Sequence, residues 1–323
     1  MNVRDAMRRQ IGDMLDGTLH GDAAVRWLAD ITLEELLPSQ LAGAVEAVME
    51  RAVPFPAFPD AIDCCGTGGD GLHTLNISTA AAMVVAACGV KVAKHGNRAV
   101  TSTSGSADIL QALGLNTNLT AEQSATLLRE VGMTFLFAPS FHPGFARVAP
   151  IRKAVGKRTI FNLLGPLCNP ARVERQLIGV FAPYLCSLVA EAAQYLGRRH
   201  IMAVHGEDGS DELSISGPTH VAELTQGKVH YLAIRPQDAG ITPQPIDALR
   251  GGTPNENAEA LRAIFAGKAH AYADAVVLNA AAALVLAGKA GKLYDGALMA
   301  RNAIALGKAT RTLDHLIEAS HSV

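Results

Sequence analysis

The stretch AIDCCGTGGDGLHTLNIST, residues 61–79, joins three local signals in one short segment. AIDCC is a short apolar run after a proline-rich segment, which is typical of a buried strand. The glycines of residues 66–71 predict a turn, and NIST at residues 76–79 opens an alanine-rich segment that reads as a helix. A strand, a glycine turn and a helix in this order indicate α/β layering.

The same alternation continues along the chain. Apolar runs at residues 91–95, 133–138, 176–182 and 200–206 predict further strands, and alanine-rich stretches between them predict helices. Thr253, followed three residues later by Glu256, predicts a helix start, and residues 269–318 read as helical. The chain from residue 61 onward is therefore expected to be an α/β unit.

The N-terminal part has a different character. Residues 1–52 show apolar residues at helical spacing and predict short amphipathic helices. Pro54, Pro56 and Pro59 then interrupt any helix before the first strand. We therefore expect a small helical module followed by a domain boundary.

Composition narrows the functional classes. The 323 residues, 33.8 kDa, fit two domains or one large α/β unit, and 49% hydrophobic against 18% charged residues indicate a globular protein. Lys and Arg total 28 and Asp and Glu total 30, so the formal charge is −2. Nonspecific nucleic-acid binding needs a basic excess, and no nucleic-acid partner is expected.

The cysteines and the apolar runs indicate the cellular compartment in which the protein is expected. The five cysteines are an odd number without a C-x-x-C pair, which favours a reducing cytoplasm. Residues 1–15 lack the apolar core of a signal peptide, and the apolar runs at 80–90 and 275–288 are shorter than the roughly 18 residues of a membrane span. We expect a cytoplasmic protein that does not contact a membrane.

The loop at residues 66–71 satisfies G-x-G-x-x-G, the dinucleotide fingerprint, which is a weak signal alone. A dinucleotide site also expects an acidic residue about 20 positions later, but residues 71–107 contain no Asp or Glu. Exposed backbone N–H groups beside a helix N-terminus predict a phosphate cradle instead. A plain glycine turn before a capped helix is the alternative.

Two further segments suit a polyanion and a hard cation. Residues 94–108 combine Lys94, His95 and Arg98 with a run of Ser, Thr and Gly, as in a flap that closes over phosphate oxygens, although a solvated loop has a similar composition. Residues 205–215 bring Glu207, Asp208, Asp211 and Glu212 into one turn. Such a turn suits Mg²⁺ when a phosphate site is also present and is otherwise an acidic surface loop.

In the basic stretch 141–170, one arginine is a candidate carboxylate ligand, although basic helix faces are usually solvated.

Four segments in this order, GTGGDGLHTLNIST, VAKHGNRAVTSTSGSAD, FHPGFARVAPIRKAVGKRTIFNLLGPLCNP and VHGEDGSDELS, resemble the anthranilate phosphoribosyltransferase family over about residues 60–318. The resemblance implies an α/β fold in which a small N-terminal helical domain adjoins a larger domain with a central mixed, mostly parallel sheet flanked by helices. It places the helical domain at residues 1–59, with helices from about 143–170 packed on it, and the α/β domain at 60–142 and 171–323. It also implies a homodimer joined through the helical domains, two Mg²⁺ ions, and transfer of phosphoribose from phosphoribosyl pyrophosphate to the amine of anthranilate in tryptophan biosynthesis.

The resemblance further assigns residues. It implies that phosphoribosyl pyrophosphate binds to the glycine loop, the next helix start and the flap, at Gly66, Gly69, Asp70, Thr74, Asn76, Ile77, Ser78, Thr79, Lys94, His95, Gly96, Asn97, Arg98, Ala99, Val100, Thr101, Ser102 and Ser106. It implies that Ser78, Asp211 and Glu212 hold the magnesium ions. It implies anthranilate contacts at Gly66, Asn97, His142, Arg152 and Pro166, with His95 also lining its route. No side chain is assigned as an acid or base catalyst, because positioning and electrostatics are expected to carry the reaction.

The chain departs from this pattern at two places. Many relatives have a lysine at the position of Thr103, and relatives usually carry a longer helical stretch between Gln40 and the glycine loop. The shorter stretch predicts a weaker dimer. Two alternatives stay open at this point: a pyrimidine nucleoside phosphorylase, which would not need the Asp211 and Glu212 magnesium site, and a noncatalytic nucleic-acid-binding relative.

Overall fold

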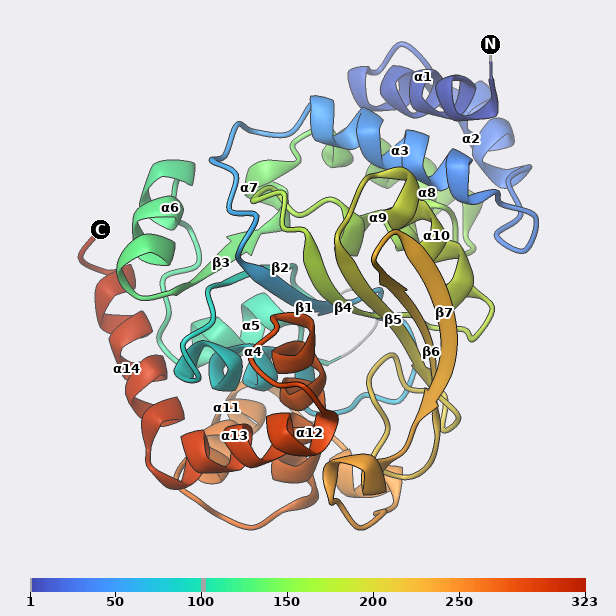
Figure 1. The fold of residues 1–323 in the computed structure, drawn as a ribbon. Helices are drawn as coiled ribbons and strands as arrows, with labels where there is room; N and C mark the ends of the chain where they lie inside the picture. Colours follow the sequence, from blue (N-terminus) through green and yellow to red (C-terminus); the bar gives the residue numbers. More distant parts are fainter. Residues whose placement is uncertain (1, 100–102) are drawn as a thin grey trace.

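The computed structural model describes residues 2–99 and 103–323, and its first helices form a separate layer at the N-terminus (Figure 1). These are α1 (Val3–Asp16), α2 (Gly21–Ala29) and α3 (Pro38–Glu50). Helix α1 packs along α3, and Ile11, Met14, Leu41 and Val45 are buried between these helices and their neighbours. The predicted short amphipathic helices of residues 1–52 are confirmed.

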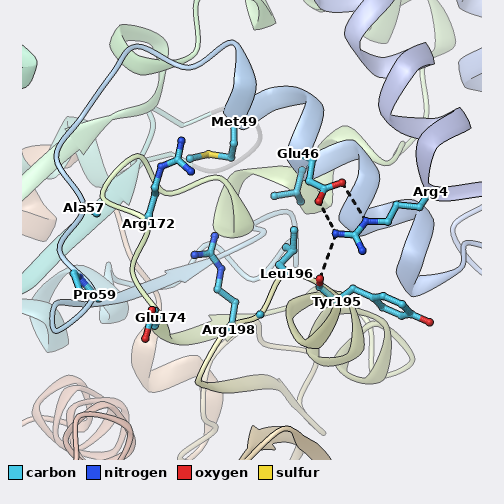
Figure 2. A pocket seen from close by; sticks show the side chains of 12 residues that line it. Arg4, Glu46, Met49, Ala57, Pro59, Arg172, Glu174, Tyr195, Leu196 and Arg198 are labelled. Atoms are coloured by element: carbon cyan, nitrogen blue, oxygen red, sulfur yellow. Dashed lines mark hydrogen bonds and ion pairs between the residues drawn. The ribbon is translucent and has the colours of Figure 1, made fainter.

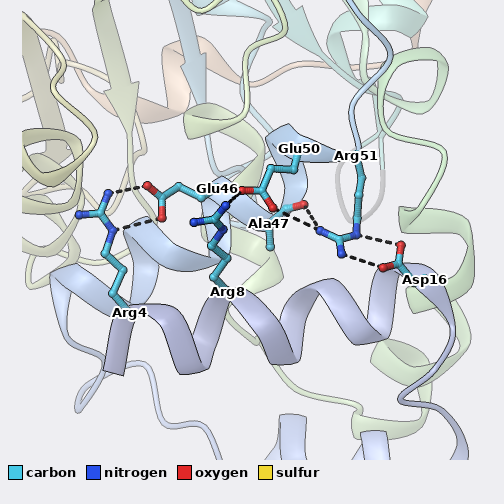
Figure 3. Close-up of polar contacts among 7 residues, drawn as sticks. All are labelled: Arg4, Arg8, Asp16, Glu46, Ala47, Glu50 and Arg51. Atoms are coloured by element: carbon cyan, nitrogen blue, oxygen red, sulfur yellow. Dashed lines mark hydrogen bonds and ion pairs between the residues drawn. The ribbon is translucent and has the colours of Figure 1, made fainter. Parts of the chain in front are cut away.

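A ladder of ion pairs joins α1 to α3 at their rim (Figure 3). Arg4 pairs with Glu46 at 2.5 Å, Arg8 pairs with Glu50, and Arg51 pairs with Asp16 at 2.7 Å. Exposed pairs contribute little each, so the ladder fixes the register of the two helices more than it stabilises them.

The centre of the molecule is one seven-stranded sheet. Its strands are β1 (Ile62–Gly66), β2 (Val92–Gly96), β3 (Met133–Phe137), β4 (Arg175–Gly179), β5 (His200–Gly206), β6 (Thr219–Thr225) and β7 (Lys228–Ile234), in the order β3-β2-β1-β4-β5-β6-β7. The first five run parallel, and β6 and β7 are antiparallel. The five predicted strands and the mixed, mostly parallel sheet are therefore confirmed.

Strands β6 and β7 were not predicted from the sequence. They form a hairpin whose two turn residues, Gln226 and Gly227, have φ angles of +50° and +73°. Positive φ at both positions is the backbone of a tight hairpin turn. Most of β7 is exposed, so its sequence lacks the apolar run that marks the other strands.

Helices cover both faces of the sheet (Figure 1). On β4, Leu177 packs into one apolar cluster and Ile178 into the other, as expected from the alternation of side chains along a strand. The cluster of Leu177 contains α4 (Ile77–Ala87), α5 (Ser106–Ala112), α11 (Pro254–Phe265), α12 (Ala271–Leu286), α13 (Leu293–Ala305) and α14 (Lys308–Ser320). The cluster of Ile178 contains α1–α3, α8 (Phe145–Val155), α9 (Phe161–Leu167) and α10 (Leu185–Tyr195).

Smaller elements complete the chain. Helix α6 (Ala121–Glu130) lies beside β3, α7 (Ala138–Phe141) follows it, and two 3₁₀ turns span Pro236–Ala239 and Ile246–Leu249. Thr253 caps α11 together with Glu256, as the sequence predicts. Within the described residues, no helix has the length and apolar character needed to cross a membrane.

Candidate active site

The chain order reverses between β1 and β4. From β1 the chain steps outward to β2 and β3, and it then returns to the other side of β1 to form β4 and β5. Loops leave the carboxyl ends of β1 and β4 in opposite directions at such a point, so a crevice opens between them. Gly66 ends β1 and Gly179 ends β4, which places the glycine loop at this crevice.

The glycine loop exposes backbone donors at the end of β1. Gly68, Gly69 and Gly71 have φ angles of +63°, +76° and +79°, a region that other residues rarely adopt. The N–H of Gly68 donates to Oδ2 of Asp211 at 2.7 Å, and the guanidinium of Arg158 donates to the carbonyl of Gly69. The loop is thus held to the acidic turn from one side and to the basic stretch from the other.

The N-terminus of α4 faces the same crevice. Asn76 occupies the cap position without capping the helix, because its Oδ1 instead accepts from Nδ2 of Asn257 at 2.9 Å and from Oγ of Ser104 at 3.3 Å. The N–H of Ser78 donates to Oε1 of Glu212 at 3.1 Å. A carboxylate from another loop therefore lies on this helix end, which is the place where a helix favours an anion. This geometry differs from the alternative of a glycine turn with a self-capped helix.

The acidic turn divides into two functional halves. Asp211 and Glu212 face the glycine loop and α4, and burial raises the pKa of both carboxyls. The charge of Asp70 raises the pKa of Asp211 further, and the charge of Asp211 does the same for Glu212. Asp208 points away from them and accepts hydrogen bonds from the hydroxyls of Ser210, Ser214 and Ser216 at 2.7, 2.5 and 2.7 Å. The first pair is available for a ligand, whereas Asp208 shapes the turn.

Lys94 supplies a buried positive charge beneath these carboxylates. Its Nζ donates to the carbonyl of Cys64 at 2.6 Å and to Oγ of Ser78 at 3.3 Å. The lysine also acts on the pKa of Glu212, which it lowers against the effect of burial. Ser78, Lys94 and Glu212 therefore form one contiguous polar group.

The donors at this point fit a magnesium ion. Ser78, Asp211 and Glu212 offer oxygen atoms only, which is the ligand type that Mg²⁺ prefers. Among the residues that the structure describes, no cluster of three or more His, Cys, Asp or Glu side chains forms a complete cage. A partial set of two carboxylates is what Mg²⁺ uses when water and substrate phosphates fill the other positions.

The flap is tied together at its base by Asp108. One oxygen of this carboxylate accepts the N–H groups of both Ala99 and Gly105 at 2.9 Å, and the other lies 3.6 Å from Arg98. Ser106 donates to the carbonyl of Asn97 at 3.2 Å. The predicted ligands Val100, Thr101 and Ser102 lie outside the described residues.

The predicted acceptor residues gather on the other side of β2. Nδ1 of His95 lies 2.9 Å from the carbonyl of Gly165, and Nε2 of His142 lies 2.9 Å from that of Cys168. The second ring nitrogen of each histidine, Nε2 of His95 and Nδ1 of His142, is buried without a hydrogen-bond partner in the described part of the chain. Unpaired buried polar atoms are uncommon, and a ligand often completes them.

A line of rings connects these histidines to Arg152. The ring centroids of His95 and His142 are 5.2 Å apart, those of His142 and Phe145 are 5.7 Å apart, and those of Phe145 and Phe161 are 5.8 Å apart. The guanidinium of Arg152 lies 5.9 Å from the Phe161 ring. The line offers an apolar, aromatic wall that ends in a cation.

The protonation states along this wall follow from burial. Burial lowers the pKa of His95 to about 3 and that of His142 to about 4, so both rings are neutral near pH 7. Burial also lowers the pKa of Arg152, although a guanidinium keeps its proton at any ordinary pH. Arg152 forms no ion pair with the described residues and is free to bind a carboxylate.

The remaining predicted ligands lie nearby in supporting positions. Pro166 is buried in α9, and its carbonyl accepts a hydrogen bond from Gln176 at 2.7 Å. Ile77 and Thr79 are buried on α4, Thr74 pairs with Arg250 in an isolated bridge, and Asp70 accepts the N–H of Leu72 at 3.1 Å. Asp70 and Thr74 thus lie between β1 and α4, and Ile77 and Thr79 lie in the first turn of α4.

Three supporting residues have roles that were not predicted from the sequence, although Arg158 belongs to the basic stretch 141–170. Asp108 holds the flap base, Arg158 binds the glycine loop while lying 4.2 Å from the Phe181 ring centroid, and Asn279 holds Leu213 behind the acidic turn at 3.0 and 3.2 Å. For two of these residues the sequence contains a feature that could have revealed the role. Asp108 is the first acidic residue after Asp70, and Asn279 interrupts the otherwise apolar centre of α12.

Comparison with known proteins decides the family. The sequence model described as glycosyl transferase family, a/b domain, matches residues 58–310. A protein of Novosphingobium aromaticivorans named anthranilate phosphoribosyltransferase is 47% identical over 306 residues, which is 95% of this chain and 93% of the relative. The chain belongs to the anthranilate phosphoribosyltransferase family. The four-segment resemblance is thereby confirmed.

Solved structures of the family agree with this fold. The anthranilate phosphoribosyltransferase of Thermus thermophilus superposes with a TM-score of 0.94 at 39% identity, covering 98% of this chain and 95% of that one. The enzyme of Saccharomyces cerevisiae in complex with PRPP and Mg has a TM-score of 0.87 at 29% identity, covering 99% and 93%. The same yeast enzyme is known in complex with 4-fluoroanthranilate, with a TM-score of 0.86 at 28% identity over the same shares. This member of the anthranilate phosphoribosyltransferase family is accordingly a glycosyltransferase-type enzyme with the expected α/β fold.

Proposed function

We propose that this chain transfers the phosphoribosyl group of 5-phosphoribosyl 1-pyrophosphate to the amine of anthranilate and releases pyrophosphate, a step of tryptophan biosynthesis. The observation that carries the proposal is the meeting of the glycine loop, the N-terminus of α4 and the carboxylates of Asp211 and Glu212 at one crevice. The family membership of the chain supports it independently.

The donor substrate is assigned to the β1 side of the crevice. The backbone N–H groups of residues 66–71, the N-terminus of α4 and the flap that begins at Gly96 present hydrogen-bond donors to phosphate oxygens. Lys94 adds a fixed positive charge below them. The flap residues Asn97, Arg98, Ala99 and Ser106 are proposed to contact the pyrophosphate together with Val100, Thr101 and Ser102.

We assign two Mg²⁺ ions to the acidic side of the crevice, held by Ser78, Asp211 and Glu212. When bound, magnesium would neutralise the charge that develops on the departing pyrophosphate. The raised pKa values of the two carboxyls reflect a site that lacks enough positive charge when it is empty of cation. Water and substrate oxygens would complete the coordination.

Anthranilate is assigned to the aromatic wall between His95 and Arg152. The fork of Arg152 suits the planar carboxylate of the acceptor, and the rings of His142, Phe145 and Phe161 suit its aromatic body. We assign Gly66 and Asn97 to the acceptor as well. Pro166, on α9, borders the route by which the acceptor enters.

The reaction then needs positioning more than proton transfer. The bond between C1 of the ribose and the pyrophosphate oxygen breaks, the amine nitrogen bonds to C1, and the amine loses one proton. An aryl amine is uncharged near pH 7, so its lone pair is already available and no strong base is required. Holding the amine at C1 and stabilising the leaving anion are the tasks of this site.

The assembly and location are also proposals. We propose a homodimer joined through the N-terminal helical region, with residues 1–59 and the helices of about 143–170 acting as one domain and residues 60–142 and 171–323 as the other. The contacts of α8 with α1 and α2 and of α9 with α3 support this grouping. The cytoplasmic location rests on the cysteine usage, and all five cysteines are free thiols.

A fluorescence assay tests the activity directly. The purified protein is mixed with phosphoribosyl pyrophosphate, Mg²⁺ and anthranilate, and the loss of anthranilate fluorescence is followed. We expect turnover that needs all three components. No turnover of anthranilate, combined with phosphate-dependent cleavage of a pyrimidine nucleoside, would instead support a phosphorylase. Salt-sensitive binding of nucleic acid without turnover would support a binding protein.

A further inference from the structure

A cavity lies at the amino-terminal end of the parallel strands, opposite the end that carries the proposed active site. It encloses about 500 Å³, and its lining includes residues that precede the parallel strands: Pro59 before β1, Arg172 and Glu174 before β4, and Arg198 before β5. These residues lie at the amino ends of strands whose carboxyl ends form the crevice described above. The volume is within the range of small-molecule sites.

Arginines dominate the polar lining of this cavity (Figure 2). Arg4 is neutralised by Glu46 at 2.5 Å and also donates to the carbonyl of Tyr195 at 3.3 Å. Arg172 and Arg198, by contrast, form no ion pair with any described residue. Two guanidinium groups thus share the cavity with one remaining carboxylate, Glu174.

Arg198 is fixed in place by backbone carbonyls and forms no ion pair within the described residues. Its Nη1 donates to the carbonyl of Val173 at 3.0 Å and its Nη2 to that of Leu167 at 3.4 Å, while its Nε is buried and has no partner in the described structure. Burial lowers the pKa of Arg198, the charge of Arg172 lowers it further, and the carboxylate of Glu174 acts in the opposite direction. The cavity therefore brings two guanidinium groups close to a single carboxylate that has no ion pair in the described chain.

The rest of the lining is apolar. Met49 and Val45 from α3, Leu196 after α10, and Ala57 and Pro59 from the proline-rich segment surround the arginines. Figure 2 shows Arg172, Arg198 and Met49 around the same cavity, with the guanidinium of Arg198 pointing toward its middle. An apolar wall beside paired guanidinium groups suits an anion with a hydrophobic body.

We propose that this cavity binds a small organic anion, whose carboxylate or phosphate group lies on Arg172 and Arg198 and whose apolar part packs against Met49 and Leu196. The anion would relieve the repulsion between the two guanidinium groups. This site is separate from the active site and does not depend on the activity proposed above.

Methyl NMR of methionine gives a local readout. The chain has 8 methionines, and Met49 lines the cavity, so its methyl resonance, assigned with Met49→Leu, reports on occupancy. The probes are benzoate, inorganic phosphate and, as an uncharged analogue, benzyl alcohol. We expect a saturable shift of the Met49 signal with benzoate and none with benzyl alcohol, and a shift with phosphate would show that the site accepts that oxyanion as well.

Arg172→Asn is the decisive variant. Arg172 has a φ angle of +51°, a conformation that asparagine adopts readily, and its exposed side chain makes no hydrogen bond within the described chain, so the fold should persist. Loss of a charge-assisted contact should weaken the benzoate response at least about tenfold. Arg199→Gln, next to Arg198 but outside the lining, should leave it unchanged. The absence of a saturable shift with benzoate and phosphate, or an equal response in Arg172→Asn, would overturn the proposal.

Discussion

A Cβ atom on Gly179 would lie 1.5 Å from the carbonyl oxygen of Asp211. The backbone of the acidic turn therefore rests directly on the end of β4. A Cβ atom on Gly66, at the end of β1, would likewise lie 2.4 Å from Oδ2 of Asp211. The two glycines at the point where the strand order reverses are what allow the carboxylates to reach the glycine loop.

Gly179→Ala should therefore disturb the site as well as the fold. The methyl group overlaps with backbone that has little room to move, which costs about 1–3 kcal/mol of unfolding free energy in typical overpacked positions. We expect a lower midpoint of denaturation and a strong loss of turnover. Gly291→Ala is the matched control, because a Cβ atom there meets nothing within 4 Å. Wild-type stability and activity in Gly179→Ala would contradict the close approach.

Removal of both inward-facing carboxylates should separate activity from folding. We expect that Asp211→Asn combined with Glu212→Gln nearly abolishes turnover, because the proposed magnesium ligands lose their charge. The fold should survive, since two carboxylates whose charged forms are disfavoured by burial are replaced by neutral groups of the same shape. Rates over a Mg²⁺ titration and a denaturation curve check this. Near-normal rates at low Mg²⁺ would show that the metal assignment is wrong.

Arg152→Ala should affect the acceptor substrate alone. A charge-assisted hydrogen bond contributes roughly 1.5–3 kcal/mol, which corresponds to about a 10- to 100-fold loss in kcat/KM for anthranilate. The KM for phosphoribosyl pyrophosphate should barely change. Lys153→Ala, at the exposed neighbouring position, is the control. Equal impairment toward both substrates, or toward neither, would mean that the acceptor site is misplaced.

Asp108→Ala should loosen the flap. The carboxylate accepts the N–H groups of Ala99 and Gly105, so its loss frees both ends of the flap from each other. We expect a higher KM for phosphoribosyl pyrophosphate and a smaller change in the KM for anthranilate, measured by steady-state kinetics. Glu122→Ala, which removes an exposed acidic residue from the first turn of α6, should change neither value. An unchanged KM for the donor substrate in Asp108→Ala would argue against the flap's role.

The stretch between Gln40 and the glycine loop, which the family resemblance predicts to be shorter than in relatives, should weaken the proposed dimer. In the structure this stretch holds the rest of α3 and then residues 51–61, which form no helix. We expect sedimentation across a concentration series to show dissociation at low protein concentration. A dimer that stays intact at nanomolar protein would disprove this expectation.

Much of the architecture follows from local patterns. The five parallel strands are buried apolar runs, and Thr253 with Glu256 marks the start of α11, so periodicity and capping suffice to find them. Strand β7 escapes this approach because its face is exposed and only its pairing with β6 makes it a strand. The hairpin turn at Gln226 and Gly227 is the local signal that points to it.

The sequence by itself determined the α/β class, the glycine loop, and the acidic and basic segments, because each rests on residues that are near neighbours in the chain. The family resemblance already pointed to Asp211 and Glu212, but only the tertiary structure gives the physical reason: these two carboxylates turn toward the glycine loop and α4, while three serine hydroxyls bind Asp208. The tertiary structure also decided that Asp108 joins the two ends of the flap at its base and that Asn279 supports the acidic turn from α12. These relationships join residues through the order of the strands and the contacts between helices and loops, and side-chain direction there depends on packing that no local pattern encodes.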